Sequence, residues 1–112
     1  MLRVNNLTKK ATPRIPYKNI KEKILGAKYE LSLVLAGEKL MANLNKIYRQ
    51  KTEAASALSF PLSKKEGEIF LNINNTRKEI LFLFIHSLLH LKGLKHGKYM
   101  EQKENLYYNK SV

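Results

Sequence analysis

The stretch Ile80-Leu-Phe-Leu-Phe-Ile-His86-Ser-Leu-Leu-His90-Leu91 is apolar on almost every side of a helix, apart from its two histidines. A helix that is apolar all round is typical of the middle of a domain, with a sheet covering one side and other elements covering the rest. We therefore expect the remainder of the chain to pack around this segment and to enclose its histidines.

The residues that flank this stretch carry signals for both ends of a helix. Asn75 or Thr76 can cap its N-terminus, and Glu79 places a negative charge in the first turn, where it suits the helix dipole. Gly93 is of the residue type that most often follows a helix, because glycine readily adopts a left-handed backbone conformation. The helix is therefore predicted to end at about Lys92.

All three histidines of the chain lie within residues 86–96, with the spacing H-x3-H-x5-H. His86 and His90 are four residues apart, so they share one face of the helix, with Cβ atoms roughly 5 to 6 Å apart. A turn at Gly93 would let His96 swing back toward them. Three neutral imidazoles favour zinc, one ion per chain, although nickel, copper or iron could bind the same nitrogens. We predict that His86, His90 and His96 are the metal ligands.

Three protein ligands leave one coordination position free, which is the arrangement of a catalytic zinc site. The alternative is a closed structural site in which a glutamate is the fourth ligand, and Glu79 is the easiest to place because it shares the helix face of His86. The other candidates are Glu68, Glu101 and Glu104. Ser87 stands where the metalloprotease signature H-E-x-x-H has its glutamate, so the segment favours phosphodiester chemistry over peptide hydrolysis.

The composition points to a polyanionic partner. The chain has 21 lysines and arginines against nine acidic residues, giving a formal charge of +12. Such a field favours nucleic acid, because neutralised phosphates release their counterions, although a basic surface can also be merely solvated. Cysteine is absent, so disulfides, zinc-thiolate sites and thiol nucleophiles are excluded.

The remaining periodicities predict a single α+β domain over residues 1–112, with a small mixed sheet packed against helices. Strands are expected at 2–7, 29–36, 57–60 and 68–73, and further helices at 17–25, 39–49 and 99–108. The short loop between the last two strands makes an antiparallel pair plausible.

The N-terminus lacks the apolar run of a secretory signal, and the apolar stretch at 80–91 is far short of the ~20 residues that cross a bilayer. A cytoplasmic protein without a membrane partner is expected.

Several segments together resemble the bacterial YbeY family of endoribonucleases, or rRNA maturation factors. The family's H-G-x-L-H-L-x-G-x-D-H pattern is matched by the histidine segment at 86–96. Its L-N-x-x-Y-R and L-S-F-P segments resemble Leu44-Asn45-Lys-Ile-Tyr48-Arg49 and Leu58-Ser59-Phe60-Pro61, and its G-D-I strand resembles Gly67-Glu68-Ile69. The order also agrees, and the resemblance covers roughly residues 29–97.

This resemblance implies a compact α+β fold with zinc held by His86, His90 and His96, and single-strand-specific RNA cleavage. The activity would serve maturation of the 3′ end of small-subunit rRNA and ribosome quality control, with the small ribosomal subunit and its proteins as further partners. Arg49 would be the basic residue implicated in activity, where its guanidinium could hold a phosphate bidentately. The attacking group would be water or the 2′-hydroxyl of the RNA.

The chain departs from the family pattern at three positions near these motifs. Lys95 stands where the family has aspartate before the last histidine, Ser87 replaces a glycine, and Ser56 replaces an aspartate before the L-S-F-P segment. The segment from Ile69 to His86 and the C-terminal region are also shorter than usual. These changes bear on catalytic rate and partner surfaces more than on the metal ligands.

A second function remains open. The protein could be a non-catalytic RNA-binding or ribosome-assembly factor in which the metal only supports folding. In either case Tyr48 or Phe60 could stack on RNA bases, although core packing is the simpler role for Phe60.

Overall fold

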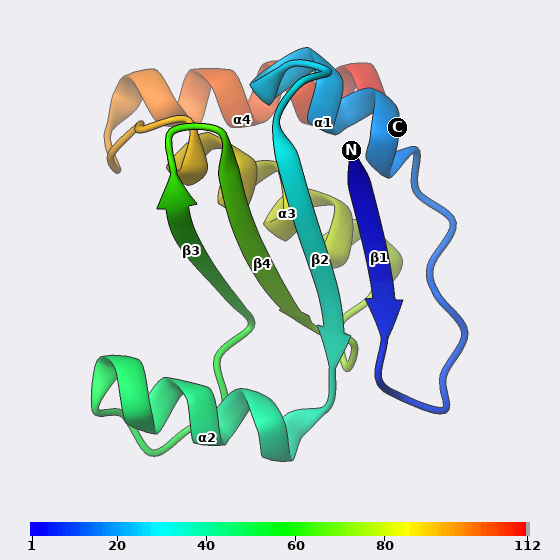
Figure 1. The fold of residues 1–112 in the computed structure, drawn as a ribbon, viewed down its shortest axis with the longest axis vertical. Helices are drawn as coiled ribbons and strands as arrows, with labels where there is room; N and C mark the ends of the chain where they lie inside the picture. Colours follow the sequence, from blue (N-terminus) through cyan, green and yellow to red (C-terminus); the bar gives the residue numbers. More distant parts are fainter. Residues whose placement is uncertain (112) are drawn as a thin grey trace.

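The computed structural model describes residues 1–111, which form one four-stranded sheet and four helices (Figure 1). In chain order the elements are β1 (Leu2–Asn6), α1 (Tyr17–Leu25), β2 (Glu30–Ala36), α2 (Glu38–Arg49), β3 (Ala57–Ser63), β4 (Glu66–Asn72), α3 (Arg77–Leu91) and α4 (Lys98–Ser111). The strand order in the sheet is β1-β2-β4-β3. Strands β1, β2 and β4 are mutually parallel, whereas β3 is antiparallel to β4. The predicted α+β class with a small mixed sheet is confirmed.

The two faces of the sheet bury different helices. Apolar residues of β2 and β4 such as Leu33 and Ile69, which pair in register, belong to the main core with α1, α3 and α4. On the opposite face Leu58 and Phe70 pack with Met41 of α2 in a smaller core. In Figure 1 α2 accordingly lies apart from the other helices, near the end of β2.

Helix α3 has the enclosed position that its composition predicts. Its residues pack against β3 and β4 on one side and against α1 and α4 on the other. Thr76 caps its N-terminus: the hydroxyl accepts from the backbone N–H of Glu79 at 3.2 Å, and the Glu79 carboxylate accepts from the backbone N–H of Thr76 at 2.8 Å. The helix ends at Lys92 as its C-cap, and Gly93 follows with a φ of 105°. The predicted start and end of this helix are thus confirmed.

Most other boundaries differ from the predicted ones by one to three residues. Strand β3 differs most clearly, because it was expected to end before Pro61 but continues through this proline to Ser63. Proline lacks an N–H to donate, but β3 is an edge strand and can carry this residue on its unpaired side. Within the described residues, no helix has the length and apolar character needed to cross a membrane.

Candidate metal centre and its cleft

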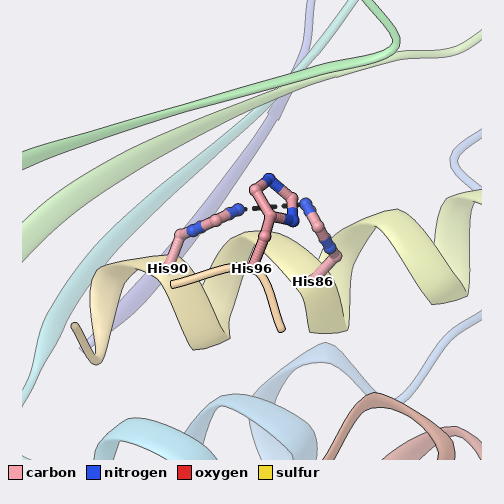
Figure 2. Close-up of side chains that lie close together, drawn as sticks. All are labelled: His86, His90 and His96. Atoms are coloured by element: carbon pink, nitrogen blue, oxygen red, sulfur yellow. Dashed lines mark hydrogen bonds between the residues drawn. The ribbon is translucent and has the colours of Figure 1, made fainter. Parts of the chain in front are cut away.

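The three histidines converge at the C-terminal end of α3 (Figure 2). His86 and His90 project from successive turns of the helix, and the turn at Gly93 brings His96 back over them. One nitrogen from each ring lies within 4.8 Å of the others, and the ring centroids are 4.5 to 5.2 Å apart. The predicted clustering of the three side chains is therefore present.

The two helix-borne imidazoles face each other through their Nε2 atoms, which are 3.1 Å apart. Each Nδ1 points outward to an acceptor: that of His90 to the Leu94 carbonyl at 3.2 Å, and that of His86 to Oε2 of Glu104. These acceptors favour the tautomer in which Nδ1–H donates and Nε2 keeps its lone pair.

This donor set fits a metal ion. Two imidazole nitrogens bound about 2.0 to 2.1 Å from a tetrahedral ion would lie about 3.3 Å apart, close to the observed Nε2 separation. His90 is also kept in the ligating form, because burial, helped by the neighbouring His86, lowers its pKa below the ordinary histidine value. Three imidazole nitrogens could hold zinc or another borderline divalent ion at this point.

The histidines open onto a cleft of about 330 Å³. Its walls come from α2, the segment between α2 and β3, the start of β3 and one face of α3. Arg49, the last residue of α2, lines this cleft and is exposed, and it forms no ion pair with any residue from 1 to 111. The structure thus brings Arg49 and the three histidines to one concave surface, with an unpaired guanidinium available to a phosphate.

Asn45 fixes one wall of the cleft. It lies one turn before Arg49 on α2 and is only 3% exposed, and its side-chain amide donates to the Glu53 carbonyl at 2.8 Å. This bond ties the segment between α2 and β3 to the helix. Within residues 1–111 the Asn45 Oδ1 has no hydrogen-bond partner. The motif at residues 44–49 that contains Asn45 was evident in the sequence. The contact of Asn45 with Glu53 was not, because the partner is a backbone atom in an irregular segment.

The three departures from the family pattern occupy different places. Ser87 is buried and Ser56 is exposed, and both line the cleft. Lys95 is exposed and does not line it. The serines therefore alter the cleft wall directly, whereas Lys95 changes the charge beside it.

No carboxylate joins the histidine group among the described residues. Glu79 is held in the capping box at the start of α3, roughly 10 Å along the helix from His86 at 1.5 Å per residue. Glu68 lies in a separate groove, and Glu101 is exposed. Glu104 contacts the outer nitrogen of His86, on the side of the ring away from His90.

Tyr48 and Phe60 lie outside the metal cleft. With Phe70 they form an aromatic row, with ring centroids 5.0 and 5.8 Å apart, that lines a groove of about 350 Å³ together with Glu68. Tyr48 is 62% exposed, whereas Phe60 is half-buried. Any base stacking there would be at a distance from the histidines.

A second groove of about 400 Å³ adjoins the metal cleft, since Ser56 and Leu83 line both. Phe82 of α3 and Tyr108 of α4 meet edge to face in it, with centroids 6.1 Å apart. The Phe82 ring is also nearly parallel to that of His86, at 6.4 Å. Phe82 could not be recognised from the sequence, because an aromatic residue in an apolar helix gives no signal that separates it from the core.

Sheet topology and site together define an α+β fold in which two histidines of the central helix and a third just beyond it form a group that could hold a metal ion. The family model described as "Endoribonuclease YbeY" matches residues 3–111. The chain therefore belongs to the YbeY family, as its motifs predict.

Individual relatives agree with this assignment. Proteins named Endoribonuclease YbeY from Pelagibacter ubique and Alkaliphilus metalliredigens are 33% and 32% identical in the aligned regions, which cover 79% and 68% of this chain. The same regions cover 73% and 63% of those two proteins. The solution structure of TM1509 from Thermotoga maritima matches 97% of this chain and 87% of its own, with a TM-score of 0.67 and 27% identity.

Proposed function

We propose that this protein is a metal-dependent endoribonuclease that cleaves single-stranded RNA during rRNA processing, with residues 1–112 acting as one domain. The observation that carries the proposal is the cleft shared by the three histidines and Arg49. Family membership supports RNA cleavage as the reaction. Maturation of the 3′ end of small-subunit rRNA and ribosome quality control are the proposed setting, in the cytoplasm and with the small ribosomal subunit as partner.

In this mechanism His86, His90 and His96 hold one ion, with zinc as the proposed metal. When bound, such an ion supplies Lewis acidity and lowers the pKa of water. Arg49 binds the two non-bridging oxygens of the phosphate through its planar guanidinium. It stabilises the negative charge that develops on these oxygens as the phosphodiester is attacked. The attacking group is water or the RNA 2′-hydroxyl.

The shape of the site supports a single-stranded substrate. His86 and His90 are half-buried and His96 is exposed, and all three line a concave cleft together with Asn45 and Arg49 of α2. A flexible strand can bend into such a cleft and leave its bases unstacked, whereas a stiff A-form duplex presents its phosphates only along the outside. The net charge of +12 favours the encounter with RNA.

Metal removal gives the direct test. Zinc-loaded protein should cleave a single-stranded rRNA fragment, whereas chelator-treated protein and a folded His90→Ala variant should lose cleavage by at least about 100-fold, because the remaining imidazoles cannot hold the ion. Lys98→Ala, at an exposed position just beyond the histidine segment, is the control variant and should retain activity.

Gel analysis of labelled RNA measures the cleavage, and a matched duplex tests strand preference. A 2′,3′-cyclic phosphate on the product would identify the 2′-hydroxyl as the attacking group, and a 5′-phosphate would identify water. Cleavage that persists after both chelation and the substitution contradicts the metal mechanism. RNA binding without cleavage in any sample would instead establish the non-catalytic RNA-binding function.

A further inference from the structure

Glu104 is a buried carboxylate on α4, a helix whose other charged and amide side chains are exposed or half-buried. It is 6% exposed, whereas Glu101 and Asn105 on the same helix are exposed. Met100, one turn earlier and 1% exposed, shares its face. That face of α4 packs against α3, so the carboxylate is delivered to the metal centre from an element 18 residues away in sequence.

Burying a carboxylate costs free energy unless hydrogen bonds or an opposite charge compensate. The polar partner of Glu104 among the described residues is Nδ1 of His86. The contact therefore affects both residues. Glu104 gains a hydrogen-bond donor, and the His86 ring is held in one orientation with its proton on Nδ1. Nε2 of the same ring is then left as an acceptor that faces His90 and His96.

We propose that Glu104 is a positioning residue of the metal centre. It selects the His86 tautomer that offers Nε2 to the ion and raises the basicity of that nitrogen, as outer carboxylates do for histidine ligands. Helix α4 then contributes to the metal site through Glu104. Lys95, the exposed neighbour of His96, cannot supply this carboxylate, so the centre draws it from α4. The inference rests on the proposed metal site but not on RNA cleavage.

Zinc affinity tests the proposal. In competition with a chromogenic chelator, Glu104→Ala should bind zinc roughly 10 to 100 times more weakly than the unaltered protein. Glu104→Gln should lie between them, because its amide oxygen still accepts from Nδ1–H but carries no charge. Glu101→Gln, an exposed glutamate on the same helix, is the matched control and should bind zinc like the unaltered protein.

A second measurement separates positioning from a merely structural role. In protein labelled with ¹⁵N-histidine, the two ring nitrogens of His86 should show the tautomer protonated at Nδ1, and Glu104→Ala should shift this ring toward a mixture of tautomers. Circular dichroism shows whether each variant is folded, and Glu104→Gln preserves the side-chain volume if Glu104→Ala does not fold.

Both variants must differ from Glu101→Gln for the proposal to stand. Zinc affinity in a folded Glu104→Gln variant equal to that of the control would overturn it, as would a His86 ring protonated at Nε2 in the unaltered protein. The proposed endoribonuclease activity can fail without affecting either result, because neither measurement uses RNA.

Discussion

Arg49 shows how much the surroundings of one residue decide its role. On the sequence it is a basic residue at the end of an amphipathic helix, where most arginines are solvated surface groups. In the structure it borders the cleft of the three histidines and has no ion-pair partner within residues 1–111. Its guanidinium thus borders the same cleft as the proposed metal ligands and has no ion-pair partner among the described residues.

Replacing Arg49 should therefore impair catalysis without impairing metal binding. We expect Arg49→Ala to lower kcat by roughly 100-fold, the usual effect of removing one donor that stabilises transition-state charge. Arg49→Lys should recover part of this loss, because it keeps the charge but not the bidentate geometry. Zinc content by elemental analysis should stay unchanged, and Lys46→Ala on the same helix is the control. A fully active Arg49→Ala variant would remove this residue from the mechanism.

At the level of elements, α3 both contributes to the stability of the fold and carries two of the proposed metal ligands. Its length and enclosure place His86 and His90 one turn apart at its C-terminal end, while its N-terminus is closed by the capping box of Thr76 and Glu79. Hydrogen bonds from Thr76 to the Glu79 carboxylate hold the pKa of that group below its usual range. The capping box therefore stabilises the helix that carries two of the proposed ligands.

Thr76→Ala should remove the hydroxyl cap and lower the free energy of unfolding by about 1 kcal/mol, measured by urea denaturation at pH 7. Because the folded-state pKa of Glu79 is lowered, its contribution is present above the unfolded-state pKa and disappears as the pH falls through the folded-state value. The difference between the two proteins should thus shrink in acid. An NMR titration should show the Glu79 pKa returning only partly toward normal in Thr76→Ala, because the backbone N–H of residue 76 still donates to the carboxylate. A difference that grew as the pH fell would contradict the assigned cap.

At the level of the whole molecule, the property that bears on RNA binding is the net positive charge. With a net charge of +12, the affinity for any RNA strand should contain a large contribution from counterion release. This contribution is independent of base sequence, so discrimination between RNAs has to come from the cleft and the grooves beside it.

Fluorescence anisotropy with a single-stranded oligonucleotide should show the logarithm of the binding constant falling linearly with the logarithm of salt concentration. Each phosphate neutralised contributes a slope of about −0.7 for a single strand. Arg49→Ala should reduce the magnitude of the slope by about that amount, if Arg49 contacts one phosphate. A slope near zero would show that the positive charge of the chain does not face the RNA.

How well the sequence predicted each feature depends on how local its cause is. The pairing of His86 with His90 follows from helical periodicity, and the end of α3 follows from Gly93, so both were predictable from neighbouring residues. The strands and their antiparallel β3–β4 pair were predictable from alternation and a short loop. By contrast, the alternative in which Glu79 is a ligand did not take into account its distance from His86 along the helix. The capping box holds the Glu79 carboxylate at the start of α3.

By itself the sequence determined the identity of the candidate ligands, the helix that carries two of them and the family to which the chain belongs. These properties depend on side-chain chemistry and on spacings of a few residues. Only the tertiary structure decided that Arg49 borders the histidine cleft, that the aromatic row of Tyr48 and Phe60 lines a separate groove, and that Glu104 contacts His86. Each of these depends on how the helices pack on the two faces of the sheet, and residues far apart in the chain meet only through that packing.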